Sequence, residues 1–441
     1  MVGGSQPPKS NFRYEEGEGL IRLIQIRDYK SDANKVYIPI DKAKRFVDVN
    51  DVMIGRYGPP IFQILRGLTG AYNVALMKAV PTAEIFDNDY LYRYLSNQDL
   101  YNYVESASDR TAGQSGVNKA HLEKYPVGLP PLAEQKQIAA RLDALLAQVD
   151  TLKTRLDAIP TILKRFRQSV LAAAVSGKLT EVWRGAAELS GWRTKTIKNV
   201  IISLNQGWSP KCLNCTVNDS EWGVIKTSSI QELYFVKSEN KKLPDNLEPR
   251  AELSVAKNDI LITRAGPRSR CGVTCIVESD YPKLMICDKV YRIRVDNSKI
   301  HPNFLNYLLN SASLLFEIEK IKTGTSENGM NLTQKKFIDL HIKLPPIREQ
   351  TEIALQVDQL FAFADQIEQR VAEAKKRVDH LTQSILAKAF RGDLTAEWRA
   401  QNPDLISGEN SAEALLARIR AERAVASASP ARKPGKRRSG A

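Results

Sequence analysis

The chain has 441 residues, a mass of 49.4 kDa and a formal net charge of +14 at pH 7. This length exceeds one ordinary hydrophobic core and predicts two or three domains. With 43% hydrophobic and 26% charged residues, the composition excludes a mainly disordered chain, and no apolar run approaches the roughly 20 residues of a membrane span. Five cysteines are too few for a disulfide framework, so we expect a reducing, cytoplasmic environment. The basic excess favours a polyanionic partner over a merely solvated basic surface.

In chain order, the first predicted element is a short apolar strand at 50–59, which ends in Arg56 and a Gly-Pro turn. A helix at 88–97 and a polar loop at 111–118 follow it. Residues 1–19 resemble nothing in the second half of the chain. We therefore expect the first globular unit to be shortened at its N-terminus.

A long helix is predicted over 134–176. Its apolar positions run from Ile138 to Val170 with spacings that alternate between four and three residues, which is typical of a seam facing another helix. Leu-Pro-Pro marks the start and Gly177 marks the end. At 1.5 Å per residue the helix is roughly 65 Å long. Pro160 is expected to kink or split it.

The long helix is repeated 215 residues later. The segment 129–184 matches 344–399 without a gap, with 22 identities in 56 positions. The second copy keeps the Leu-Pro-Pro-x-x-Glu-Gln start, the same alternating seam from Ile353 to Ile385 and a final Gly392. The match indicates duplication, and the equal lengths favour two seams that face each other.

The globular part before each helix is repeated more weakly. A strand at 258–267 ends in Arg264 and a Gly-Pro turn, and a helix at 302–311 and a polar loop at 323–331 follow. We expect an α+β chain with the order globular, helix, globular, helix. The predicted parts are a first globular domain (1–128), a first spacer helix (129–185), a second globular domain (186–343), a second spacer helix (344–400) and a C-terminal segment (401–441) whose composition from Arg423 onward predicts a basic, disordered tail.

These features resemble the DNA-specificity subunit of type I restriction–modification systems, and residues 394–411 resemble the type IA (EcoKI-like) group. The resemblance covers about residues 20–425. It implies two target-recognition domains held apart by an antiparallel coiled coil, each reading one half of a bipartite double-stranded DNA site. It also implies two modification subunits that hold S-adenosylmethionine and methylate adenine, and restriction subunits that use ATP and magnesium. No cofactor is expected in this chain.

The sequence predicts recognition without catalysis. The four histidines are scattered, and no glycine-rich cofactor turn or methyltransferase tetrapeptide occurs. A stand-alone DNA-binding nuclease or methylase is the alternative, and a purely structural coiled-coil protein is a third interpretation. Cys212, Cys215, Cys271 and Cys275 have zinc-like spacings, but the pairs are far apart in sequence, so we predict reduced cysteines and no metal site.

The predicted DNA contacts lie on the repeated turns and loops, where bases and phosphates can be reached by polar and basic side chains. The candidates are Arg56, Tyr57, Gln114, Ser115, Asn118, Trp208, Lys211, Arg264, Arg268, Arg270, Thr325, Ser326, Asn328 and Asn331. The segment Gly207–Lys211 has no predicted counterpart in the first unit. We therefore expect the second domain to be the more competent reader.

Overall fold

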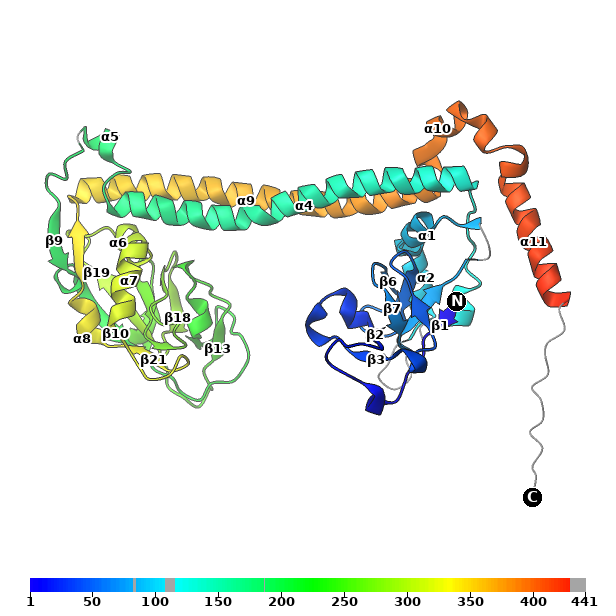
Figure 1. Cartoon of the computed structure of the whole chain (residues 1–441). Helices are drawn as coiled ribbons and strands as arrows, with labels where there is room; N and C mark the ends of the chain where they lie inside the picture. The colour runs from blue at the N-terminus through cyan, green and yellow to red at the C-terminus, as the bar shows by residue number, and fades with distance from the viewer. Residues whose placement is uncertain (82–84, 108–115, 186, 429–441) are drawn as a thin grey trace, which may run out of the picture. The chain divides into compact units, whose positions relative to one another are not determined.

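The computed structural model describes residues 1–81, 85–107, 116–185 and 187–428, and the chain forms two compact units. The first unit comprises Met1–Leu156 and Ala374–Ala441, and the second comprises Asp157–Glu373. Two 44-residue helices, α4 (Leu132–Val175) and α9 (Ile347–Phe390), each contribute one part to either unit (Figure 1). Among the described residues, no helix is both long and apolar enough to cross a membrane.

The two long helices lie side by side and antiparallel within each unit (Figure 1). The predicted α+β fold with a pair of facing long helices is therefore confirmed. Pro160 lies inside α4, which continues through it, so the helix is not split there, and the alternative of a local kink stays a prediction. The contacts between the two helical segments show their antiparallel direction, because residue numbers rise in the first segment as they fall in the second. The contacting pairs are Glu134 with Thr395, Lys153 with Asp379, Arg167 with Asp365, and Thr180 with Glu349.

The predicted apolar seam enters the core of each unit. In the first unit, Ile138 and Leu142 of α4 and Ile385 of α9 are buried in one cluster with the globular part. In the second unit, Val170 of α4 and Ile353 of α9 are likewise buried in one cluster with the globular part. A repeat of 3.5 residues keeps one stripe of a helix facing its neighbour over many turns. The seam therefore closes the two cores as well as joining the helices.

The globular part of the first unit contains two four-stranded sheets. One is antiparallel with the order β1-β8-β5-β6, and the other has the order β3-β2-β7-β4, in which β2 and β7 run parallel. The strands are β1 (Val2–Gly3), β2 (Leu20–Ile24), β3 (Tyr37–Pro39), β4 (Phe46–Val47), β5 (Val52–Gly55), β6 (Gln63–Leu65), β7 (Gly70–Tyr72) and β8 (Leu76–Ala79).

The globular part of the second unit has two larger sheets, β10-β19-β15-β17-β12 and β13-β11-β18-β14, and two small ones, β16-β21-β20 and β22-β9. The strands are β9 (Arg193–Thr196), β10 (Ile201–Gln206), β11 (Gly223–Ile225), β12 (Leu233–Tyr234), β13 (Asn240–Lys242), β14 (Ser254–Val255), β15 (Ile260–Thr263), β16 (Ala265–Gly266), β17 (Thr274–Ile276), β18 (Tyr281–Met285), β19 (Val290–Val295), β20 (Lys322–Thr323), β21 (Met330–Leu332) and β22 (His341–Leu344).

The two globular parts share one strand topology. The order β1-β8-β5-β6 corresponds to β10-β19-β15-β17, and β3-β2-β7-β4 corresponds to β13-β11-β18-β14. The parallel pair β2–β7 of the first unit recurs as β11–β18 in the second. The duplication that the sequence displays most clearly in the helices therefore extends through the folded domains.

The first residues of the chain occupy the place that the end of β10 takes in the second unit. Residues 1–19 were predicted to resemble nothing there, and the likeness that the structure adds lies in backbone pairing. The predicted five-part division and the shortened first domain stay predictions. The pairs Val2–Lys78 and Gly3–Met77 between β1 and β8 correspond to Asn205–Arg292 and Gln206–Tyr291 between β10 and β19.

The shorter helices include those predicted at 88–97 and 302–311, which are confirmed as α1 and α6. The residues from Arg423 to Ala428 belong to α11, so the prediction of a disordered tail was wrong for them, while 429–441 lie outside the described residues. The short helices are α1 (Asn88–Leu95), α2 (Gln98–Ser106), α3 (Lys119–Leu122), α5 (Glu181–Arg184), α6 (Pro302–Leu309), α7 (Ala312–Ile321), α8 (Gln334–Ile338), α10 (Ala396–Gln401) and α11 (Ala412–Ala428).

Candidate nucleic-acid interface

A buried glutamate at the start of each long helix holds the segment that follows the other long helix. Glu349 of α9 accepts hydrogen bonds from Thr180 (2.8 Å), Arg184 and the Trp192 indole (3.1 Å). Glu349 is 2% exposed, so a lost partner could not be replaced by water without rearrangement. The repeated Glu, Thr and Arg of the sequence are therefore structural. In the first unit, Glu134 likewise accepts from Thr395 (2.6 Å) and Arg399 (2.5 Å).

The glutamine after each glutamate ties the same helix to its globular part. Gln135 donates to the Ile85 carbonyl (2.9 Å) and accepts from the Asp87 amide (2.9 Å) at the start of α1. Gln350 accepts from the His301 amide (2.8 Å) at the start of α6. Both glutamines are fully buried. Each helix is thus fixed to the sheets that carry the candidate contacts.

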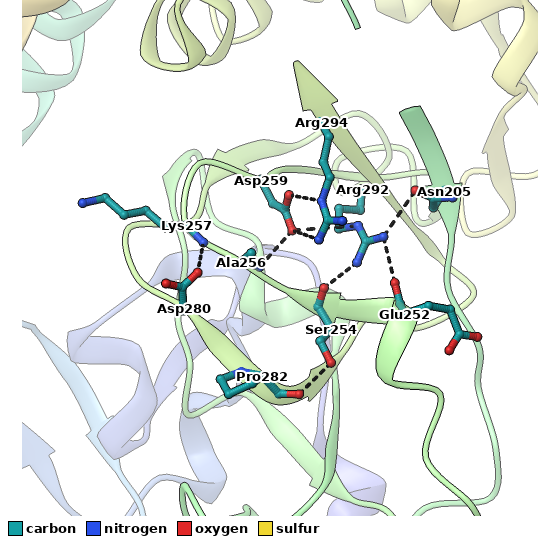
Figure 2. A network of polar contacts seen from close by, with 10 residues as sticks. All are labelled: Asn205, Glu252, Ser254, Ala256, Lys257, Asp259, Asp280, Pro282, Arg292 and Arg294. Atoms are coloured by element: carbon teal, nitrogen blue, oxygen red, sulfur yellow. Dashed lines mark hydrogen bonds and ion pairs between the residues drawn. The ribbon is translucent and has the colours of Figure 1, made fainter. Parts of the chain in front are cut away.

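An ion-pair network around the buried Asp259 and Arg292 fixes the strand that leads to Arg264 (Figure 2). Asp259, just before β15, accepts from Arg294 (2.8 Å) and from the Ala256 amide (2.9 Å), and its carboxylate lies 3.8 Å from Arg292. Arg292 also donates to carbonyls of Ser254 and Glu252. Burial lowers the pKa of Arg292, while the Asp259 carboxylate acts against this shift.

The first unit contains a simpler form of this network. Lys78 pairs with Asp51 and also approaches the Phe46 carbonyl. Asp51 accepts from the Asp48 amide (2.7 Å), as Asp259 does from Ala256. Val80, which corresponds to Arg294, is exposed and carries no charge. The network is therefore a framework element of both domains, and it is larger in the second.

The two predicted strand-end arginines each donate to a carbonyl of the same turn in their domain, although they lie over different rings. Arg264 donates to the Asp288 carbonyl (3.1 Å) and lies over the Tyr291 ring, and Arg56 donates to the Val74 carbonyl (3.4 Å) and lies over Tyr57. The accepting carbonyls belong to matching turns, which precede β19 and β8. Each guanidinium is therefore partly engaged in positioning a turn, and its contact with DNA stays a prediction.

The polar loop of the second unit lies next to Arg264. β16, which follows this arginine, pairs with β21, and Asn331 faces Ala265 in that ladder. Thr325, Ser326 and Asn328 lie exposed in the connection between β20 and β21. The structure thus brings together two segments that are about 60 residues apart, and leaves their amide and hydroxyl groups accessible for base or phosphate contacts.

Arg268 and Arg270 serve different purposes. Arg268 bonds to Glu319 (2.5 Å) and Glu327 (2.8 Å), which raise its pKa, and it holds the polar loop in place through Glu327. Arg270 donates to the carbonyls of Thr227 (2.8 Å) and Ile230. Both arginines are committed to neighbouring protein groups in the free chain.

The predicted Gly207–Lys211 segment borders the same surface. The Trp208 amide donates to the Ile286 carbonyl (3.0 Å), and Arg250 lies over the Trp208 ring. Ser209 bonds to Asp288, the residue whose carbonyl binds Arg264. Lys211 is exposed. Loop, turn and arginine therefore form one continuous surface.

In the first unit, the candidates Tyr57 and Asn118 lie at the pairing that corresponds to β16–β21. Tyr57 forms a β-bridge with Gly116, and the Val117 amide donates to the Arg56 carbonyl (3.0 Å). Asn118 caps α3 by accepting from the His121 amide (3.1 Å). The predicted contacts Gln114 and Ser115 lie outside the described residues.

Sequence reasoning missed two groups of this surface. Lys289 is exposed next to Asp288, and its carbonyl accepts from the Arg264 amide (2.8 Å). Gly4 and Ser5 in the first unit occupy the place of Gly207 and Trp208, and the polar residues Gln6 and Lys9 follow them as Ser209 and Lys211 follow Trp208. The shared Gly-x-x-Pro spacing of Gly4 and Gly207 was the available signal.

The cysteines lie in several environments. Cys271, Cys275 and Cys287 are buried, Cys212 is half-buried and Cys215 is exposed. Burial raises the pKa of Cys287 to about 11. Within the described part of the chain, no three His, Cys, Asp or Glu side chains are grouped as metal ligands would be. The absence of a metal site stays a prediction.

Two domains of one topology, each presenting polar and basic groups around a strand-end arginine, define a two-part nucleic-acid recognition protein. The chain belongs to the family of the type I restriction modification DNA specificity domain, whose family model matches residues 24–161 and 190–376. Proteins of this family recognise DNA and are not themselves catalytic; they work with methylase and restriction subunits.

Several known proteins are similar to this chain. The StySPI specificity subunit of Salmonella potsdam is 39% identical, over 80% of this chain and 75% of the relative. The EcoBI specificity subunit of Escherichia coli is 38% identical, over 92% and 86%. The HsdS subunit from Thermoanaerobacter tengcongensis shares the fold with a TM-score of 0.53 at 20% identity, over 85% of this chain and 91% of that chain. A structure of a type I restriction–modification assembly gives a TM-score of 0.66 at 20% identity, over 85% and 92%.

Proposed function

We propose that this chain supplies the DNA-sequence recognition of a type I restriction–modification complex, and that each globular domain reads one part of a bipartite target. The observation that carries this proposal is the repetition of one surface on two domains of the same topology. In each, a strand-end arginine binds a turn that also contacts a glycine-containing loop. Exposed polar groups on loops beside a rigid sheet suit base readout.

The catalytic groups are proposed to reside in partner subunits. Two modification subunits would bind S-adenosylmethionine and methylate adenine, and restriction subunits would use ATP and magnesium, with the complex acting in the cytoplasm. The absence of cofactor motifs from the sequence and the names of the relatives support this division of work.

The proposal is tested by reconstituting the chain with its modification subunits and mapping methylated adenines on genomic DNA. We expect one bipartite target sequence, and we expect the chain alone to show no turnover with magnesium or with S-adenosylmethionine. Methylation or cleavage by the pure chain at stoichiometric level would support a stand-alone enzyme instead.

A second measurement tests the assigned surface. Replacing Lys211 and Asn328 by alanine should weaken recognition of one half-site only, because both side chains are exposed on the surface of one domain. Lys195→Ala is the matched control, since this exposed lysine lies on β9, in the separate β22-β9 sheet. Equal behaviour of the double variant and the control would contradict the assigned surface.

A further inference from the structure

The loop that begins at Gly4 corresponds to the loop that begins at Gly207 in the second domain. The Gly207 and Trp208 amides donate to the carbonyls of Val290 (3.4 Å) and Ile286 (3.0 Å). The Gly4 and Ser5 amides donate to Leu76 (3.0 Å) and Tyr72 (3.1 Å). The two acceptors are four residues apart in both domains. The backbone of each loop is therefore held by two equivalent hydrogen bonds to the corresponding turn of its own domain.

Both loops require glycine because a side chain at that position would collide with the backbone of the turn. A Cβ atom on Gly4 would lie 1.8 Å from the Asn73 carbonyl oxygen, and one on Gly207 would lie 2.1 Å from that of Ile286. Real Cβ atoms do not approach backbone oxygen so closely. Each loop is thus packed directly on the turn that accepts a hydrogen bond from the strand-end arginine, Arg56 or Arg264.

Each loop carries a proline three residues after the glycine and exposed polar side chains on either side of that proline. Pro7 is buried and Pro210 half-buried, while Gln6 and Lys9 are exposed, as Ser209 and Lys211 are in the second domain. The Gln6 amide donates only a long bond (3.4 Å), to the carbonyl of the next residue, among the contacts of the described residues. An exposed glutamine amide of this kind can be redirected to a base edge, where it can donate and accept together.

We infer that residues Gly4–Lys9 form a base-reading loop of the first domain, in which Gln6 determines specificity at one base and Lys9 contacts a phosphate. This inference rests on the proposed function and assigns to the first domain a reading element at its N-terminal segment. Glutamine pairs well with the N6 and N7 groups of adenine in the major groove. Lysine contributes a charge that neutralises phosphate regardless of sequence.

The test uses the full chain in complex with its modification subunits. Gln6→Ala should relax one base position in one half of the methylated target, with a loss of discrimination of roughly 10- to 100-fold, and leave the other half unchanged. Lys9→Ala should weaken binding to specific and unrelated duplexes alike and reduce the slope of log affinity against log salt by about one. Gln98→Ala, on the exposed surface of α2, is the control and should retain the wild-type target and affinity.

The inference is overturned if Gln6→Ala and Lys9→Ala match the control in target sequence, affinity and salt dependence while the wild-type complex methylates its bipartite target. That result would leave the proposed function intact. A wild-type complex without sequence-specific methylation would overturn the proposed function and this inference together. Because both residues are exposed, circular dichroism should show that the variants fold.

Discussion

The first and second units share a backbone plan but differ in how strongly side chains reinforce it. Glu349 receives three side-chain donors, including Trp192, whereas Glu134 receives hydrogen bonds from Thr395 and Arg399. The buried glutamate and its threonine and arginine partners recur in both copies. Where backbone bonds suffice, as in the strand ladders, the residues have diverged.

The same contrast applies to the ion-pair network beneath the recognition surface. Asp259 forms ion pairs with two arginines and is 2% exposed, whereas Asp51 forms one with the half-buried Lys78. The bidentate Arg294 and the burial of Asp259 and Arg292 make the second network the more rigid support. The comparison predicts that matched substitutions will affect the second unit more wherever the framework is concerned.

The largest effect is expected from Glu349→Ala. The Arg184 side chain, which is 8% exposed, would lose its ion pair with this carboxylate while it stays charged. We expect the free energy of unfolding of the second unit to fall by about 3–5 kcal/mol. Glu134→Ala should cost less, because the Arg399 side chain is 35% exposed and can be solvated. Hydrogen exchange followed by mass spectrometry over 177–192 and 392–399 measures both, with the exposed Glu373→Ala as control. Equal losses would contradict the contrast.

The second-largest loss of stability is expected from Asp259→Asn. An amide cannot pair with Arg292 and Arg294, and we expect a loss of about 3 kcal/mol in the second unit. Asp51→Asn should have a smaller effect, since water can reach Lys78. Hydrogen exchange of the peptides containing β15 and β5 provides the comparison. A larger effect in β5 would show that burial does not govern these networks.

Arg264→Ala and Arg56→Ala sharpen the comparison at the recognition surface. The expectation that the second domain reads better rested on a first domain without a counterpart of Gly207–Lys211, and Gly4–Lys9 removes that premise. Because both arginines bind equivalent turns, we now expect similar losses, roughly 1–3 kcal/mol each, in fluorescence anisotropy with target DNA. A loss confined to Arg264 would restore the original expectation.

The smallest effect is expected at the start of α6. His301 stands where Asp87 caps α1, yet His301 makes no side-chain cap bond. His301→Asp should supply one and stabilise the second unit by about 1 kcal/mol, measured as a rise in the thermal unfolding midpoint. His301→Ala, which adds no acceptor, is the control and should not give that rise.

His301 also predicts a pH dependence. Burial lowers the pKa of His301 in the folded chain, and the Asp358 carboxylate acts against this shift. The unfolded chain therefore takes up a proton first, so stability is full above about pH 6.5 and falls as the pH drops towards the folded-state pKa. Unfolding midpoints of the wild type and His301→Ala between pH 5 and 8 check this, and an unchanged difference across that range would contradict it.

Much of the framework was predictable from the sequence. The alternating seam predicted the long helices because a period of 3.5 residues, sustained over many turns, indicates a helix that faces another helix. The identities at Glu134, Thr180 and Arg184 and at their copies indicated a duplicated unit, although not that each glutamate would meet the end of the other helix. That pairing required the antiparallel arrangement of α4 and α9.

The amino-acid sequence by itself determined the helices, the duplication, the family resemblance and the strand-end arginines, since each depends on local periodicity or on residue identity. Tertiary structure decided that Gly4 corresponds to Gly207, a match that the shared Gly-x-x-Pro spacing leaves open, and it alone decided that Arg56 and Arg264 bind matching turns. Both facts depend on backbone hydrogen bonds between distant segments. Such bonds are made by groups that every residue except proline carries, so they leave almost no trace in the choice of side chains.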